Sequence, residues 1–207
     1  MEAGWVAISP ATPGGIVAYN ATVVESADLG LAAWSLDPAA CIVSSGLATT
    51  VQYLAGVYYR PDPATAKLPT RILIPNAVAG TSSAFQVGLI NMDQVGANAP
   101  GTLLASSAAA GTVAAGLNSF TLAWIAAAPP VLPQGRYWVA VVNTTGTTTT
   151  VLASPNPGAG NLGVNAGTDA AHSRFGTAAT TGALGNIVVA SISASVGAGL
   201  CLCAALA

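Results

Sequence analysis

Short runs of alternating or β-branched apolar residues recur along the chain and predict β-strands. They lie at residues 49–59, 70–75, 84–92, 102–106, 119–125, 137–143 and 147–153. Successive side chains point to opposite faces of a strand, so a period of two indicates one buried and one outward face. Gly and Pro interrupt the Ala-rich stretches, and no segment has a helical period with caps at both ends. Thr144-Thr145-Gly146 predicts a hairpin between the last two strands.

The end of the chain shows the longest alternation. Every even position from Ala190 to Leu206 is apolar, whereas the odd positions from Ser191 to Cys203 are Ser, Gly or Cys. This pattern predicts one long strand over residues 187–207, paired within an assembly because an unpaired edge is prone to association. The stretch is uncharged and long enough for a transmembrane helix. Its internal Ser and Gly residues, and the lack of flanking Lys or Arg, argue against that alternative.

Eight to ten short strands separated by turn residues predict an all-β fold, an antiparallel β-sandwich or jelly roll. We assign residues 46–207 to this domain. Residues 1–45 contain several Pro and Gly residues and form either an N-terminal arm or the first strands. Residues 154–185 are rich in Pro, Gly, Asn and Thr. They exceed the usual length of a plain loop, so we expect them on a surface or in an interface.

Charged residues are scarce. Five basic and seven acidic residues make up 6% of the 207-residue chain, while 53% of it is hydrophobic; an ordinary soluble domain has about 25% charged residues. A free monomer needs a charged surface to stay soluble, so we expect other subunits to cover much of this one. The net charge of −2 offers no basic patch for phosphates, which argues against nucleic-acid binding. The low polarity also argues against disorder.

Residues Gly158-Ala159-Gly160-Asn161-Leu162-Gly163 match the glycine pattern of dinucleotide-binding proteins. That pattern binds a pyrophosphate because it opens a helix, and the helix N-terminus holds the anion. The residues that follow, Val164-Asn165-Ala166-Gly167, do not predict a helix. We interpret the match as a loop in a chain of 23 glycines and expect no cofactor.

His172 is the single histidine, and Asp169 and Ser173 lie close to it in sequence. A catalytic triad needs three groups and an oxyanion hole in a fixed geometry, which neighbours in a Gly/Thr-rich loop do not supply. We interpret His172 as a surface or interface residue. Its burial at a subunit contact would make assembly depend on pH. We assign no catalytic residue and expect no enzyme.

Three cysteines, Cys41, Cys201 and Cys203, raise the question of a metal site. Structural zinc needs about four ligands, and these thiols with a single histidine leave the set short of partners. The seven carboxylates are scattered, with no Asp-x-Asp calcium loop. We therefore expect no metal and interpret the cysteines as small apolar residues in a core or interface.

Six aromatic residues lie within the predicted strands, and we expect most of them in the core. One or two of them on the surface would form a platform for a sugar, which is the alternative for this group. They are Tyr53, Tyr58, Tyr59, Trp124, Tyr137 and Trp138.

About half of the chain carries a recognisable order of motifs. A strand of the YLAGVYY kind (residues 53–59) precedes Pro-Gly-Thr-Leu-Leu (100–104) and then Pro-x-Gly-x-Tyr-Trp-Val-Ala-Val-Val (133–142). Residues 52–153 thereby resemble the jelly-roll modules of structural proteins of tailed bacteriophages, notably minor tail, fibre and head-decoration proteins of phages that infect actinobacteria. The resemblance implies a multimeric virion component without catalytic residues. The chain is short and has no coiled-coil or collagen-like shaft, which favours a compact decoration or adaptor protein over a fibre.

We therefore expect a structural component of a phage virion, located in the virion and assembled in the host cytoplasm. It serves as a capsid decoration or head fibre, or as a tail adaptor or minor tail protein. It forms a homo-oligomer through large apolar interfaces, with a trimer preferred, and contacts other virion proteins. We expect no nucleic-acid or membrane partner. The alternative is a host-surface or carbohydrate-binding module on the same fold, because jelly rolls serve lectins and capsids alike.

Overall fold

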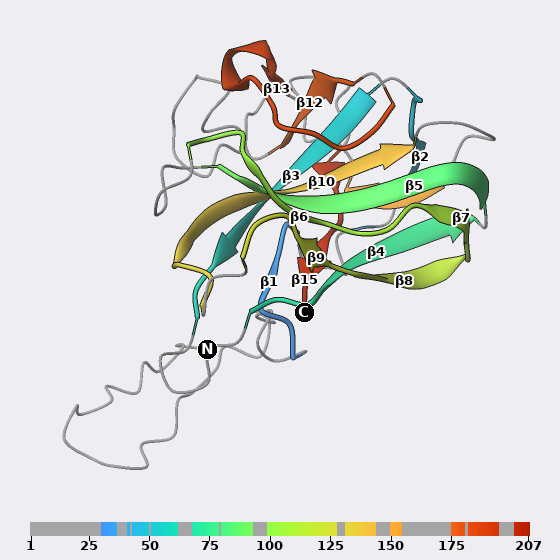
Figure 1. Cartoon of the computed structure of the whole chain (residues 1–207). Helices are drawn as coiled ribbons and strands as arrows, with labels where there is room; N and C mark the ends of the chain where they lie inside the picture. The colour runs from blue at the N-terminus through green and yellow to red at the C-terminus, as the bar shows by residue number, and fades with distance from the viewer. Residues whose placement is uncertain are drawn as a thin grey trace, which may run out of the picture.

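Two antiparallel sheets that pack face to face form the described part of the protein in a computed structural model (Figure 1). The all-β prediction is confirmed, and within the described residues the single helical element is the 3₁₀ turn η4 (Val189–Ser191). The structure describes residues 30–36, 41, 43–49, 51–61, 68–78, 80–92, 99–127, 131–143, 150–154, 175–180, 182–194 and 201–207.

Sheet A is centred on β4, which has β8 on one side and β15 and β11 on the other. Strand β1 pairs with β15, and β11 also pairs with β2 and β14. The strands of sheet A are β1 (Ala33–Trp34), β2 (Val43–Gly46), β4 (Arg71–Val78), β8 (Gly116–Thr121), β11 (Thr150–Ser154), β14 (Cys201–Leu202) and β15 (Ala205–Leu206).

Sheet B follows the order β13-β12-β3-β10-β5-β6-β9, with β7 added at β5. The three long strands β3, β10 and β5 form its middle, and they correspond to three of the runs with the clearest apolar pattern. The strands of sheet B are β3 (Val51–Tyr59), β5 (Gly80–Asn91), β6 (Leu103–Ser106), β7 (Ala110–Val113), β9 (Ala123–Trp124), β10 (Gly135–Asn143), β12 (Phe175–Ala179) and β13 (Ser193–Ala194).

The strand pairs are nested along the chain. Strand β3 pairs with β10, β4 pairs with β8, and β5 pairs with β6, so each pair encloses the next in sequence. The outer and inner pairs lie in sheet B and the middle pair lies in sheet A. The chain therefore behaves as a long antiparallel ribbon folded across both sheets.

The main core lies between the inner faces of the sheets. Alternate residues of β10 and β3, among them Val139 and Val57, meet Ile72 and Ile74 of β4 there. The rings of Phe85 and Phe120 stack across the interface with their centroids 5.2 Å apart. Removing this apolar surface from water is the dominant favourable contribution to folding.

Sheet B is also covered on its outer face, which explains why β10 is buried at seven consecutive positions. Residues Leu54, Ile90 and Trp138 form a second core there with Ile187 and Ile192. The segment 182–192 therefore lies against the outer face of the sheet. Strands buried on both faces carry continuous apolar runs, as Tyr137–Val142 does.

Specific hydrogen bonds attach this covering segment to the turn before β6. The Ile187 N–H donates to the Gly101 carbonyl at 2.7 Å, and the Leu103 N–H donates to Asn186 Oδ1 at 2.8 Å. Gly101 in turn donates its N–H to the Asn91 carbonyl at 2.7 Å. The register of the covering segment is therefore set by backbone contacts at Gly101.

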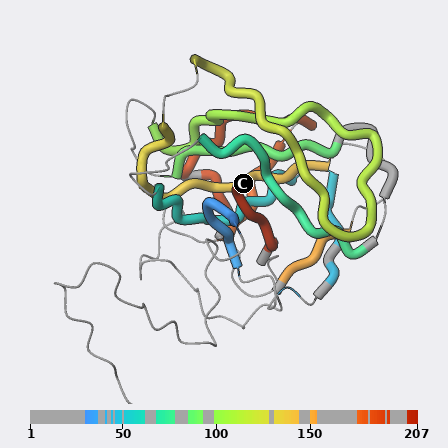
Figure 2. Tube along the Cα trace, turned by 90° about the horizontal axis from the view of Figure 1, so that it is seen from below, coloured from blue at the N-terminus to red at the C-terminus, as the bar shows by residue number. Residues whose placement is uncertain are grey.

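The prediction of one long strand at the end of the chain is wrong. The region divides into η4, β13, β14 and β15, with residues 195–200 outside the described part. Strand β14 pairs with β11, while β15 lies between β1 and β4 (Figure 2). Leu202 and Leu206 are fully buried in the main core. The alternating residues contribute to the core of the same chain through short strands, because each pairs with a different neighbour.

Two other predictions about connections are wrong. Strands β10 and β11 do not form a hairpin around Thr144-Thr145-Gly146, since β10 belongs to sheet B and β11 to sheet A. Residues 175–179 belong to the stretch 154–185 that we expected on a surface or in an interface, but they form β12 beside β3, and Phe175 is buried. Residues 155–174 of that stretch lie outside the described part. In both cases pairing between strands distant in sequence overrides the local turn composition.

A buried serine links β1 to the C-terminal strands. Ser35 Oγ donates to the Leu202 carbonyl at 2.7 Å and accepts the Ala204 N–H at 2.9 Å, while the Ser35 side chain is 0% exposed. The hydroxyl thereby satisfies backbone groups that water cannot reach.

We expect Ser35→Ala to lower the free energy of unfolding by about 1 to 3 kcal/mol, because it leaves buried backbone groups without this partner. Chemical denaturation measures the change. The matched control is Ser191→Ala, whose exposed hydroxyl donates to the Val188 carbonyl at 2.7 Å, and we expect it to stay within about 0.5 kcal/mol of the parent protein. Equal losses in the two variants would contradict the role given to Ser35.

Candidate functional site

An apolar groove of about 330 Å³ lies on the outer face of sheet A. Strands β1, β15, β4 and β8 contribute to it, and Figure 2 looks toward this side of the molecule. Its volume falls in the lower part of the range of ligand-binding pockets. The groove is lined by Leu31, Trp34, Leu36, Leu73, Pro75, Leu117, Cys203, Ala204 and Ala205.

Strand alternation explains how apolar side chains come to face outward here. Ile72 and Ile74 of β4 are fully buried toward the core, so the alternate residues Leu73 and Pro75 face the groove. Strand β8 runs beside β4 in antiparallel register, and its Leu117 lies opposite Pro75. Leu117 is 68% exposed. Both faces of β4 are therefore apolar over residues 72–75, whereas a strand with one face in solvent needs only one apolar face.

Pro75 occupies a position in β4 where a missing N–H has little cost. The Arg71 and Ala207 peptide groups exchange two hydrogen bonds of 3.0 Å, so Arg71 and the alternate residues after it direct their peptide groups away from β8. On that side β15 pairs only as far as Leu73 and β11 begins at Asn76. Pro75 lies in the gap between the two neighbours, as expected for a proline within a sheet.

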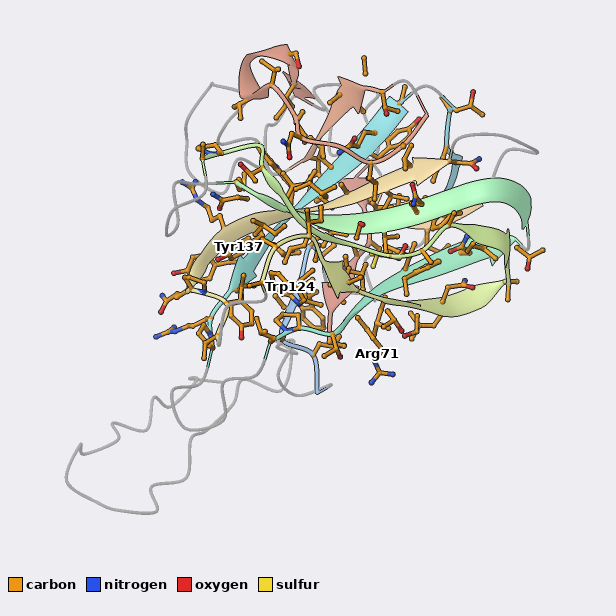
Figure 3. All side chains as sticks on the ribbon, in the orientation of Figure 1. Arg71, Trp124 and Tyr137 are labelled. Carbon is orange, nitrogen blue, oxygen red and sulfur yellow. The ribbon has the colours of Figure 1, made fainter. Side chains whose placement is uncertain are left out.

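The surroundings of the groove carry little charge. The charged residues in the described part of the chain are Arg60, Arg71 and Arg136, and none of them lines the groove. Arg71 begins β4 and is exposed, and Figure 3 shows its side chain reaching away from the body of the molecule. The described residues that line the groove therefore offer the burial of another apolar surface.

The cysteines do not form a metal centre in the described part of the protein. Cys41 and Cys203 are buried, and Cys203 contributes to the groove. The side chain of Cys201 lies outside the described residues. Within the described ranges no group of three or more His, Cys, Asp or Glu residues could hold a metal ion.

The remaining polar candidates fall outside the described residues. They are His172 with Asp169 and Ser173, and the glycine pattern of residues 158–163. Their interpretations from the sequence stay predictions.

Most of the candidate aromatic residues are core residues, as expected. Tyr59, Tyr137 and Trp138 are buried, and burial raises the pKa of the Tyr59 hydroxyl. Tyr137 donates its hydroxyl hydrogen to the Pro133 carbonyl at 2.8 Å. Half-buried Tyr53 and Trp124 pack against the main core, and Figure 3 shows where Trp124 and Tyr137 lie in the fold.

Tyr58 is the exception, since half of it is exposed. The Gln134 amide donates to the Tyr58 hydroxyl at 2.7 Å, and Arg136 lies directly opposite Tyr58 on the neighbouring strand. An aromatic ring beside an amide and a guanidinium is a polar and stacking surface suited to a sugar or a planar ligand. Neighbouring residues of a strand point to opposite faces, so the sequence already indicated that Tyr58 and Tyr59 of β3 do not share the same environment.

Sequence reasoning missed the groove because its residues come from four separate segments. Leu73 and Pro75 were counted as part of an ordinary strand, and Leu117 lay just before the predicted strand 119–125. The apolar character of both faces of residues 72–75 is the signal that could have indicated it.

No family model, no curated protein and no solved structure matches the chain. Among the described residues, no helix is long and apolar enough to span a membrane.

Proposed function

We propose that the protein is a self-assembling structural component of a bacteriophage virion, with a jelly-roll domain and an N-terminal arm. The role is a capsid decoration or head fibre, or a tail adaptor or minor tail protein. The observation that carries the assembly part is the apolar groove on the outer face of sheet A, flanked by exposed Leu117. A chain with so few charges leaves such a face in water only at a cost in solubility.

One further feature supports the jelly-roll domain and another supports the virion part of the proposal. The nested pairs β3–β10, β4–β8 and β5–β6 are what a folded antiparallel ribbon of the jelly-roll kind requires. The motifs in residues 52–153 resemble those of tailed-phage structural proteins. The trimer expected from the sequence stays a prediction.

We expect light scattering to give a molar mass above that of one chain, and Leu117→Lys to lower it at the same protein concentration. The lysine places a charge in the apolar face, and Leu117 is exposed enough for the fold to tolerate it. The matched control is Val188→Lys, since Val188 is 71% exposed and lies in the segment that covers sheet B. A monomeric parent protein at every concentration would contradict assembly. Immunogold labelling of virions tests the location, and unlabelled particles would contradict it.

A carbohydrate-binding or host-surface-binding module is the second candidate, because Tyr58 is exposed beside Gln134 and Arg136. A glycan panel distinguishes the two candidates. Binding that disappears in Tyr58→Ala, with the molar mass unchanged, would favour the second.

A further inference from the structure

Strand β8 is an edge of sheet A in the described part of the protein, where it pairs with β4 alone. Its register with β4 runs without interruption from Gly116 opposite Asn76 to Thr121 opposite Arg71. Beyond Thr121, the Leu122 N–H donates to the Thr70 carbonyl at 2.8 Å. The strand is therefore an edge of six residues that is paired with β4 without interruption.

The alternation of the hydrogen bonds between β4 and β8 shows which backbone N–H and C=O groups of β8 point away from β4. Arg71 exchanges its backbone bonds with Ala207 on the other side of β4, so Ile72 and Ile74 are the residues that bond to β8. Their partners on β8 are Phe120 and Asn118.

Bonding alternates along an antiparallel strand, so the peptide groups of Leu117, Ser119 and Thr121 point away from β4. All three residues are exposed.

Within the described ranges, this edge lacks the features that normally prevent association. Proteins protect edge strands with lysine, proline, bulges or a covering segment. The sequence of β8 is Gly-Leu-Asn-Ser-Phe-Thr, without a charge or a proline, and its register with β4 has no bulge. An exposed edge of this kind is suited to accept another strand.

We propose that β8 joins two copies of this chain, by antiparallel pairing with β8 of the second copy across a two-fold axis at Ser119. The proposal rests on the proposed function, since it specifies one contact of the self-assembly. In this register, Leu117 of one copy lies opposite Thr121 of the second copy, and Ser119 lies opposite Ser119 of the second copy. Three residue pairs are then hydrogen-bonded, and each supplies two N–H···O=C bonds. Shifting the second copy by two residues along β8 would leave only two such pairs.

A second copy is the occupant that fits this edge best. An antiparallel pair across a two-fold axis is isologous, so the same donors and acceptors meet from both sides. Ser119 places a small uncharged side chain at the axis, and Leu117 gains cover from Thr121 of the second copy. The nearby cation, Arg71, extends away from the body of the molecule and does not block the approach (Figure 3).

Ser119→Pro tests the contact directly, because it removes an N–H that points away from β4. We expect about a twofold fall in molar mass for a two-fold contact, with an unchanged circular dichroism spectrum. Ser119→Ala is the matched control, since it keeps the N–H and should keep the parent mass. A proline variant that assembles like the parent protein would overturn the proposal.

Cysteine cross-linking tests the register and does not depend on the proline variant. Bonded pairs have a Cα separation of about 5.5 Å, which a disulfide can span. Ser119→Cys should therefore form a covalent dimer on oxidation. Thr121→Cys should not, because its equivalent in the second copy lies four residues along the pair, about 13 Å away. Equal cross-linking of the two variants, or none in either, would overturn the register and with it the proposed contact.

Hydrogen exchange separates failure of this contact from failure of the proposed function. The amides of Leu117, Ser119 and Thr121 should exchange about tenfold more slowly in the assembled protein than in the dilute monomer. Assembly without this protection, or a trimer with no even-numbered species, would overturn the β8 contact and leave self-assembly standing. A parent protein that is monomeric throughout would overturn both.

Discussion

Replacing Gly101 with alanine should destabilise the protein by about 3 to 5 kcal/mol, one of the two largest effects expected from a single substitution. Gly101 has a φ of +85°, a conformation that a residue with a Cβ adopts only under strain. A Cβ at this position would overlap the Ile187 carbonyl oxygen. The carbonyl belongs to the backbone of the segment that covers sheet B, next to the Ile187 N–H that donates to the Gly101 carbonyl, so relieving the overlap requires a shift of this backbone.

Gly116→Ala is the control that separates the strain of a positive φ from the steric overlap with the Ile187 carbonyl. Its φ of +93° is nearly the same, but no atom lies within 4 Å of the Cβ position. We expect only the backbone strain there, about 1 to 2 kcal/mol. Urea unfolding of the two variants measures the difference, and tryptophan fluorescence reports on the second core through Trp138. A Gly101 variant no less stable than the Gly116 variant would show that the covering segment is not held at Gly101.

Leu206→Asp should cost at least about 4 kcal/mol and leave little folded protein, because a domain of this kind has a total stability of about 5 to 15 kcal/mol. Leu206 is 0% exposed and belongs to the main core between the sheets. Its strand, β15, pairs with β1 on one side and with β4 on the other. An unpaired carboxylate at this position would be buried without a described charged residue in the core cluster to offset it.

The control for this change is Val188→Asp, which places the same side chain at a position that is 71% exposed. We expect its free energy of unfolding to stay within about 0.5 kcal/mol of the parent value. The midpoint of urea unfolding and the yield of soluble protein measure both variants. Normal stability of the Leu206 variant would mean that the C-terminal strands are not part of the core.

The local pattern of side chains identified most of the strands, because the period of two in a strand is a property of neighbouring residues. Residues 49–59, 70–75, 84–92, 102–106, 137–143 and 147–153 correspond to β3, β4, β5, β6, β10 and β11. Strands β7 and β12 were missed, because β7 is short and small residues hide the alternation in β12. Strands β1 and β2 lie in or next to residues 1–45, where first strands were one of the two alternatives, and β13 lies within the predicted strand 187–207. The buried role of most candidate aromatic residues also followed from their positions within strands.

The sequence by itself therefore determined the all-β class, the positions of the long strands and a surface poor in charge, all of which depend on composition and local period. Only the tertiary structure decided which strands pair. It placed β10 and β11 in different sheets and β15 between β1 and β4. The apolar groove and the β8 edge depend on the same choice, since Leu31, Leu73, Leu117 and Ala205 come together only when four distant segments pair. Pairing is set by burial summed over the whole chain, and no local window of sequence contains that sum.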